Sequence, residues 1–478
     1  MRRVDSPRSA TLAAAVLFVG RLVTWGGCGD DDPRRVAVGS GGAGSGGTTA
    51  SCAALSGTAG SGATARYELI GAPLAFSPTA QGFGISVALR AGDPASLGLR
   101  ARAEGAASWS NLMPPEVRAP DLAEWTLGGL EAGTRYQYEV VGDCPTGGAA
   151  TLSQGNVVTA RPAGDRFTFA LISDTHIGAD LTYPNQGNPA TLAGASAQMA
   201  AAAPDFLVNL GDMLDFHQYG FNVPPPDGSI TRLAYLNYRS TLGALLGSTA
   251  HYPVIGGWDS ESGCDTLEEI ERSRQQRLLY LPAPGPQTYP QGGSAFEDYY
   301  AFNWGDALFV VLNVFTYTPG CHLLGTYPGL PDDWTLGAPQ LDWLRETLAH
   351  DHSRWKFLLI HHPVGGDAGN DIDTAYGRGG GRAAHVGEQA IVHELMQQYG
   401  VQIFFYGHDH VFTDMTVDNI HYTLPGSAGA IWMFTTAETG YAEFWPDAGW
   451  ARVDVSLDDV QVRFMTVTGA VLHEYTIQ

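Results

Sequence analysis

The chain has 478 residues, a formal net charge of −23 and a hydrophobic fraction of 44%. This length exceeds one ordinary domain and predicts two folded units with additional terminal segments. The acidic excess disfavours nucleic-acid binding and attachment to an anionic membrane surface, because both need clustered positive charge. An anionic substrate would therefore depend on local positive charge, which bound metal ions can supply.

The first 28 residues predict an export signal. Arg2 and Arg3 precede a short apolar stretch at 11–20, which is shorter than the roughly 20 residues that span a bilayer. Residues 25–28, Trp-Gly-Gly-Cys, resemble a bacterial lipobox, in which Cys28 would carry the lipid. A plain cleaved signal or a misassigned start codon is the alternative. We expect an exported protein, a periplasmic or cell-envelope lipoprotein of a bacterium, that meets the membrane only through this anchor.

The remaining cysteines suit an oxidising compartment. Their number is even, and they are Cys52, Cys144, Cys264 and Cys321. Such a set can form two disulfides, with three possible pairings. Their positions in the predicted domains favour Cys52 with Cys144 and Cys264 with Cys321, and four free thiols are the alternative.

Two segments follow the predicted signal. Residues 29–65 are rich in Gly, Ser, Ala and Thr, a composition that predicts a flexible linker. Residues 66–163 predict an all-β domain, because apolar and polar residues alternate in short runs at 85–89, 97–99 and 136–140.

The run from Trp125 to Tyr136 resembles a fibronectin type III domain, as found before the catalytic domain of purple acid phosphatases. The resemblance implies that the Tyr136 hydroxyl ties a loop back to the sandwich. Leu89 stands where that family often carries a core tryptophan. We interpret this domain as a spacer or packing partner, because it gathers no catalytic residue types.

Residues 165–478 predict an α/β layered fold, because strand patterns alternate with helical ones. The expected strands are 166–172, 206–210, 252–255, 357–360 and 402–406. Helical spacing appears at Leu341, Leu344 and Leu348 and again at Ile391, Leu395 and Met396.

Carboxylates and imidazoles follow four of these strands. They are Asp174 and His176, Asp212 and Asp215, His361 and His362, and His408 and His410. These side chains are ligands for zinc, manganese and iron, and the carboxyl ends of neighbouring strands converge on one crevice. Any single histidine is more often structural, and we interpret His217 and His251 in that way. Four such groups in this order predict a metal centre.

These motifs resemble the calcineurin-like metallophosphoesterase superfamily over about residues 165–478. The resemblance implies a layered β-sandwich flanked by helices and two divalent or transition-metal ions, of Fe, Mn or Zn. It implies that one ion is bound by Asp174, His176 and His410, that Asp212 bridges, and that the second ion is bound by His361 and His408. Asp215 would orient ligands, and for His362 a supporting role is favoured over simple packing.

One block departs from the family. Where the family has Gly-Asn-His followed by Asp or Glu, residues 256–259 read Gly-Gly-Trp-Asp. Gly257 offers no ligand, and Trp258 has no proton that titrates near neutral pH. Asp259, another side chain or water could fill the ligand position. Purple acid phosphatases also need a tyrosine where Asp215 stands, so a purple centre is not expected.

The resemblance implies a metal-dependent phosphoric ester hydrolase that cleaves phosphate mono- or diesters with a metal-activated water. The alternative is a catalytically degenerate binding protein of the same fold, because of the altered block. We favour the enzyme, with Asp212, Asp215 and His362 as catalytic candidates, because the other six metal ligands are all present. The general acid is unassigned.

Overall fold

The computed structural model describes residues 67–144, 148–181, 187–215, 228–259, 261, 267–315, 335–362, 364, 387–433, 441 and 443–478. The predicted signal and linker lie outside these residues, as do Cys52, Cys264, Cys321 and His217.

The described strands are β1 (Glu68–Leu69), β2 (Leu74–Thr79), β3 (Gly82–Ala91), β4 (Leu97–Ala103), β5 (Glu116–Ala119), β6 (Leu122–Leu127), β7 (Arg135–Asp143), β8 (Ala149–Val158), β9 (Phe167–Ile172), β10 (Phe206–Asn209), β11 (Ala250–Pro253), β12 (Tyr300–Trp304), β13 (Ala307–Val311), β14 (Trp355–Leu359), β15 (Ile403–Phe405), β16 (Phe412–Val417), β17 (Ile420–Pro425), β18 (Gly449–Val455), β19 (Val460–Thr466) and β20 (Val471–Ile477). The five strands predicted to precede the motifs are β9, β10, β11, β14 and β15, each within two residues of its expected bounds.

The described helices are α1 (Pro189–Ala202), α2 (Gly228–Leu242), α3 (Leu267–Tyr280), α4 (Gly337–His350) and α5 (Gly387–Tyr399). The two predicted helical patterns fall in α4 and α5. Ile391 is 40% exposed, however, and the buried stripe of α5 is Val392, Leu395 and Met396. Among the described helices, none is long and apolar enough to cross a membrane.

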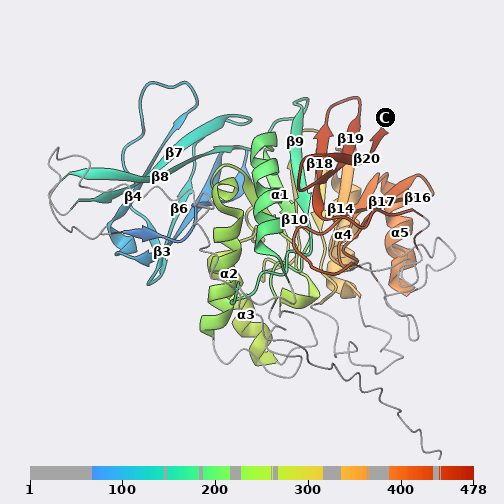
Figure 1. The fold of residues 1–478 in the computed structure, drawn as a ribbon. Coiled ribbons are helices and arrows are strands. Elements are labelled where there is room, and N and C mark those ends of the chain that lie inside the picture. Colours follow the sequence, from blue (N-terminus) through green and yellow to red (C-terminus); the bar gives the residue numbers. More distant parts are fainter. Residues whose placement is uncertain are drawn as a thin grey trace, which may run out of the picture. The chain divides into compact units, whose positions relative to one another are not determined.

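Two large sheets carry the predicted metal-binding strands (Figure 1). Eleven of the described strands form one sheet in the order β20-β19-β18-β9-β10-β11-β2-β3-β6-β5, with β1 beside β3. Six form the other, in the order β12-β13-β14-β15-β17-β16. Strands β9, β10 and β11 run parallel, and so do β13, β14 and β15. The loops that follow these strands therefore leave from the same edge of each sheet.

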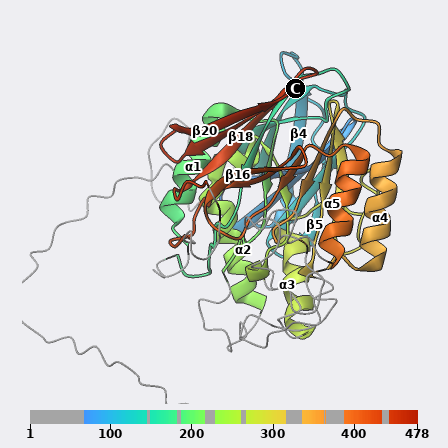
Figure 2. The ribbon, with the colours of Figure 1, turned by 90° about the vertical axis from the view of Figure 1, so that its right-hand side faces the viewer.

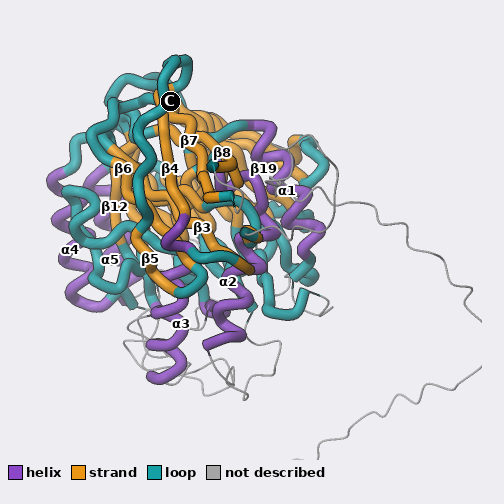
Figure 3. The backbone as a smooth tube through the Cα atoms, turned by 90° about the vertical axis from the view of Figure 1, so that its left-hand side faces the viewer, coloured by secondary structure: helices purple, strands orange, loops and turns teal. Residues whose placement is uncertain are grey.

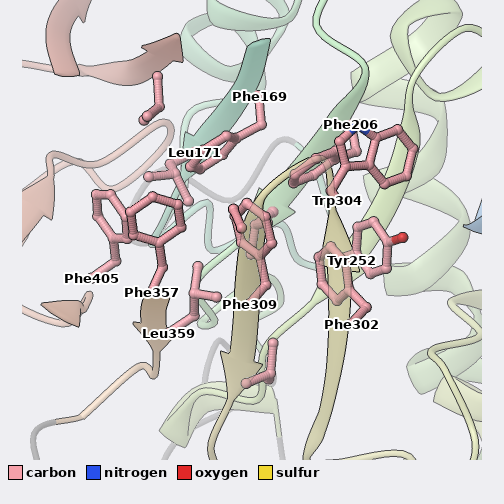
Figure 4. Packing of buried hydrophobic residues seen from close by; sticks show 14 of the residues in the cluster. Phe169, Leu171, Phe206, Tyr252, Phe302, Trp304, Phe309, Phe357, Leu359 and Phe405 are labelled. Atoms are coloured by element: carbon pink, nitrogen blue, oxygen red, sulfur yellow. The ribbon is translucent and has the colours of Figure 1, made fainter. Parts of the chain in front are cut away.

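An aromatic core lies between the two sheets (Figure 4). Phe169 from β9 meets Phe309 from β13 edge to face, with ring centroids 5.1 Å apart, and Phe302 stacks on Phe309 at 4.9 Å. Such pairs contribute about 0.5–1.5 kcal/mol beyond the area that they bury. Alternate residues of β9 and β14 point into this core, which fixes the register of the strands that carry the motifs.

Helices cover the outer faces of both sheets (Figure 2). Helices α4 and α5 pack on the six-stranded sheet through a second apolar cluster that includes Leu344, Leu348 and Val392. Helices α1 and α2 pack on the eleven-stranded sheet through a third, which includes Leu192 and Tyr235. The layered α/β fold expected from the sequence is confirmed.

The N-terminal region is a β-sandwich of strands and loops with one short 3₁₀ turn at Pro94–Ser96 (Figure 3). The three-stranded sheet β4-β7-β8 packs on β2, β3 and β6 around a core that includes Leu89, Trp125 and Tyr138. The Tyr136 hydroxyl accepts a hydrogen bond from the Glu131 N–H at 2.9 Å, as the fibronectin resemblance implied. The fibronectin type III assignment itself stays a prediction.

The sandwich is joined directly to the part of the eleven-stranded sheet that carries β9, β10 and β11. Strand β2 pairs in parallel with β11 at Phe76 and His251, and the Tyr138 hydroxyl donates to the Gly247 carbonyl at 2.8 Å. The predicted boundary at 163–165 is therefore crossed by hydrogen bonds, although the domain limits stay a prediction. Cys144 forms a disulfide bond whose partner lies outside the described residues, so the pairing also stays a prediction.

Candidate metal centre

The structure brings all six predicted metal ligands together at the carboxyl ends of β9, β10, β14 and β15. Five of them are almost completely buried and His408 is half-buried. Their ligand atoms form three overlapping groups within which every pair is 4.8 Å or less apart. We name them the Asp174 group (Asp174, His176, His410), the bridging group (Asp174, Asp212, His361) and the triple-histidine group (His361, His362, His408).

The Asp174 group presents three ligand atoms to one point. His410 Nε2 lies 3.3 Å from Asp174 Oδ1 and 3.2 Å from His176 Nε2. The His410 Nδ1 donates to the Trp432 carbonyl at 2.9 Å, because a carbonyl can only accept. This hydrogen bond leaves Nε2 as the ligand atom, an arrangement typical of metal-binding histidines.

The bridging group supplies the test of whether these residues fit a metal. Asp212 Oδ2 and His361 Nε2 lie 3.1 Å apart, and both are buried without a hydrogen-bond partner among the described residues. His361 Nδ1 donates to the Leu210 carbonyl at 2.9 Å, so the neutral ring turns its Nε2 lone pair toward a carboxylate oxygen. Two facing acceptors need a cation between them, either a proton on Nε2 or a metal ion, and the residues therefore fit a metal ion.

The same geometry shifts the pKa of His361. Burial disfavours its charged form, but the carboxylates of Asp212 and Asp174 outweigh burial and raise the pKa to about 9. These buried carboxylates therefore favour positive charge at this position, as a cation site requires.

The triple-histidine group includes His362, for which the sequence predicted only a role in supporting the metal ligands. His362 is 3% exposed, and its ring centroid lies 3.9 Å from that of His408 and 4.9 Å from that of His361. His408 itself is fixed by its N–H, which donates to both Asp174 carboxylate oxygens at 3.1 and 3.2 Å. The structure thus places a ligand atom of His362 among those of two predicted ligands.

Five of the six predicted ligands have a left-handed backbone, which is uncommon for residues other than glycine. Their φ angles are 54° at Asp174, 47° at His176, 48° at Asp212, 82° at His408 and 58° at His410. Such conformations cost on the order of 1–3 kcal/mol each and persist where surrounding contacts hold them, typically at functional sites.

Neighbouring glycines permit the close approach of these loops. A Cβ on Gly407 would lie 2.2 Å from Ser173 Oγ and 2.8 Å from His361 Nδ1. A Cβ on Gly211 would meet the same His361 nitrogen at 2.8 Å. Both positions therefore need glycine for His361 to reach the centre.

Asp259 ties two loops together. Its carboxylate accepts the Leu214 N–H at 3.0 Å and the Gly256 N–H at 2.8 Å, one on each oxygen. Burial and the nearby Asp212 raise its pKa to about 8. Asp259 belongs to none of the three groups, so among the described residues it has a structural position, and the ligand that replaces the family's asparagine stays open between another side chain and water.

The two remaining candidates from the sequence belong to none of the three groups, and the role of Asp215 stays a prediction. Asp215 is fully buried, and its N–H donates to the Ile177 carbonyl at 3.2 Å. His251 is buried in β11, where its Nε2 lies 2.9 Å from the Tyr238 hydroxyl, and burial lowers its pKa to about 3. The structural interpretation of His251 fits these contacts.

Two tryptophans flank the Asp174 group. The Trp258 ring stands edge to face against His176 at 5.3 Å, and Trp432 lies 5.0 Å from His176 and 4.7 Å from His410. Both side chains are half-buried. The backbone N–H of Trp258 also donates a hydrogen bond to Asp212 Oδ1 at 2.7 Å. The sequence reasoning missed Trp432, because it sits in an apolar run about 20 residues beyond the last motif, with no spacing to mark it.

Comparison with known proteins agrees with this geometry. The family model of the calcineurin-like phosphoesterases matches residues 167–412, which is about half of the chain. The chain belongs to this family. No curated protein matches its sequence at a significant level.

Two solved structures share the fold. The purple acid phosphatase PPD1 from yellow lupin (Lupinus luteus) seeds matches with a TM-score of 0.60 at 11% identity, over 85% of this chain and 74% of that chain. The structure of PhoD matches with a TM-score of 0.64 at 14% identity, over 87% of this chain and 92% of that chain. At these identities the likeness extends to the fold alone.

Proposed function

We propose that this protein is a metal-dependent phosphoesterase that hydrolyses phosphate mono- or diesters. The observation that carries the proposal is the buried pair of Asp212 Oδ2 and His361 Nε2, 3.1 Å apart within a cluster of further ligands. Two ions of Fe, Mn or Zn are proposed, one in the Asp174 group and one at His361 and His408, with Asp212 between them.

Bound ions would supply the positive charge that neutralises a phosphate ester and the acidity that activates water. The chain's own residues hold the ligands in place: carbonyls orient His361 and His410, and the Trp258 N–H orients Asp212. His408 is half-buried, and so are Trp258 and Trp432. An ester is therefore expected to approach on the side of these three residues.

A second candidate is a binding protein that keeps the fold and has lost catalysis. It is favoured by one observation, namely that Gly257 and Trp258 replace the asparagine and histidine of the family block. The two candidates differ in turnover, and only the enzyme needs the bound metal.

The test is metal analysis of purified protein together with hydrolysis of a monoester and a diester of p-nitrophenol. We expect bound metal and turnover of at least one ester, lost on chelation and regained on adding metal. Protein that turns over neither ester, whether loaded with metal or still metal-free after metal is added, would contradict the enzyme and favour the binding protein.

We also propose that the protein is exported and attached through a lipid at Cys28. The support is the basic and apolar start of the sequence and the disulfide at Cys144, because disulfides persist in oxidising compartments. Mass spectrometry of the mature N-terminus in a membrane fraction tests this, and an unmodified Met1 in a soluble fraction would contradict it.

A further inference from the structure

The triple-histidine group contains one more ligand than the family resemblance supplies. In the family, the second ion has an asparagine at the position of Gly257, and this chain has no side chain there. The ligand atoms of His361, His362 and His408 nevertheless lie within 4.8 Å of one another. We propose that His362 takes the place of the missing asparagine, so that three imidazoles bind the second ion. The inference rests on the metal centre of the proposed function.

A bend in the backbone makes this arrangement possible. In an extended strand, consecutive side chains point to opposite faces, so His361 and His362 could not share a ligand site there. Strand β14 ends at Leu359, and the chain bends at both histidines. The bend brings both rings toward His408, and ring rotation can close their ligand atoms to the roughly 3.3 Å spacing of a tetrahedral site.

The packing around His362 holds its ring near this site. Phe315 stands edge to face against it, with centroids 5.0 Å apart and an interplanar angle of 84°. On another side lies Gly257, where an added Cβ would be 3.7 Å from His362 Cε1 and 3.4 Å from Phe315 Cε1. A Cβ fits there in van der Waals contact, but an amide beyond it would compete with the imidazole for space. Gly257 therefore leaves room for His362.

Replacing an amide oxygen with an imidazole nitrogen also changes which metals the site prefers. Carbonyl oxygens suit Mn²⁺ and Mg²⁺, whereas imidazoles suit zinc and iron. Three imidazoles therefore favour zinc or iron over manganese at the second ion more strongly than a site with an amide oxygen would.

The first test measures zinc bound per chain, by elemental analysis, across a series of free-zinc concentrations. We expect two ions in the wild type and one in His362→Ala at the same free zinc. The affinity of the second site for zinc should fall by at least about 100-fold. Losing a residue that only hydrogen-bonds to a metal ligand typically costs about 10- to 100-fold. His362→Phe fills the space without a ligand atom, and it gives the same expected result if the alanine variant does not fold.

His393 provides the matched control. It is a histidine of α5 with 2% exposure, and its Nδ1 lies 2.8 Å from the Tyr422 hydroxyl, outside the three groups. His393→Ala should lower thermal stability and leave two zinc ions. Two ions with wild-type affinity in His362→Ala and His362→Phe would overturn the proposal.

A second test uses the coupling between Gly257 and His362. Gly257→Asn alone should weaken the second ion, because the amide crowds the imidazole. In the His362→Ala background the same change should restore it, because the amide then has both the space and the ligand role. If Gly257→Asn weakened binding of the second ion equally in the wild type and in His362→Ala, the exchange of ligands would be contradicted.

The failure of this inference can be told from failure of the proposed function. A wild type that binds two ions, loses one in His362→Ala and cleaves no ester refutes the activity and keeps the ligand assignment. An active protein that keeps both ions in His362→Ala refutes the ligand assignment and keeps the activity.

Discussion

The two ends of the metal centre are built in different ways. The Asp174 group joins Asp174 and His176, which are two residues apart in sequence, to His410 from the other sheet. The triple-histidine group depends on adjacent residues at a bend and on empty space at Gly257. The spacing of Asp174 and His176 marks the first end in the sequence, whereas no spacing marks the contact of Gly257 with His362, about 100 residues apart.

Strain is distributed unevenly across these two ends. In the Asp174 group all three residues have a left-handed backbone. In the triple-histidine group, His408 has a left-handed backbone and the described residues His361 and His362 do not. The Asp174 group is therefore held by its backbone and the hydrogen bonds that fix it. In the triple-histidine group, hydrogen bonds hold His361 and His408, and side-chain packing holds His362. Substitutions at His362 should therefore leave the Asp174 group intact.

The largest effect is expected where both ends meet, at Asp212. Asp212→Ala removes the carboxylate oxygen that faces His361 and leaves two proposed cations with less negative charge between them. Metal content should fall for both ions, and ester hydrolysis should fall by at least about 1000-fold, beyond the 100- to 1000-fold typical of losing one electrostatic donor. Elemental analysis and p-nitrophenyl phosphate hydrolysis measure this.

Asp409→Asn is the control for that substitution. Asp409 is another buried carboxylate, between two predicted ligands, but its Oδ2 accepts the Tyr441 hydroxyl at 2.7 Å and it belongs to none of the groups. The isosteric amide should keep metal content and activity. Normal metal content and activity in Asp212→Ala would refute the whole site assignment.

The next effect concerns the leaving group. With Trp258 where the family has histidine, this position cannot protonate the leaving oxygen, so the rate should depend steeply on leaving-group pKa. General acid assistance is typically worth about 100- to 10,000-fold. Aryl phosphates should therefore be cleaved far faster than alkyl phosphates, and Trp258→His should make the dependence shallower. The measurement is log rate against leaving-group pKa at saturating metal.

Trp432→His is the matched control for Trp258→His. Both tryptophans are half-buried and both contact His176, at 5.3 Å for Trp258 and 5.0 Å for Trp432. Only Trp258 occupies the family's histidine position, so the Trp432 variant should keep the wild-type slope. A shallow slope in the wild type would mean that another residue already donates the proton.

The sequence predicted the strands and the ligands at their ends for a physical reason. Buried parallel strands are nearly continuous apolar runs, and predicted ligands such as Asp174 and His410 follow them directly. It could not predict the ligand position of His362 or the contact of Trp432, because both arise from loop conformations that local spacing does not encode. It also left Asp259 open as a ligand, and only the structure shows its two oxygens engaged by backbone N–H groups.

The smallest effect should distinguish the two ends most cleanly. Ser427 is fully buried, and its Oγ donates to the Asp174 carbonyl at 2.8 Å and accepts the Ala430 N–H at 2.8 Å. These bonds hold Asp174 in its left-handed backbone conformation. Ser427→Ala should therefore cost about 1–3 kcal/mol of unfolding free energy. It should also weaken the ion of the Asp174 group by about 10- to 100-fold and weaken the second ion less, because Asp174 holds only the backbone N–H of its proposed ligand His408.

Ser456→Ala supplies the comparison that separates stability from metal binding. Ser456 is also buried, and its Oγ accepts the Asp458 N–H at 3.1 Å and the Asp459 N–H at 3.0 Å in the β18–β19 turn. Loss of this hydroxyl in Ser456→Ala should lower the midpoint of thermal unfolding about as much as Ser427→Ala does, and both metal affinities should stay at their wild-type values. Zinc titrations and thermal melts of the two variants measure the difference. Equal metal affinities in Ser427→Ala and Ser456→Ala would mean that the backbone around Asp174 is held by the strands alone, and the contrast between the two ends would then lie in their ligands.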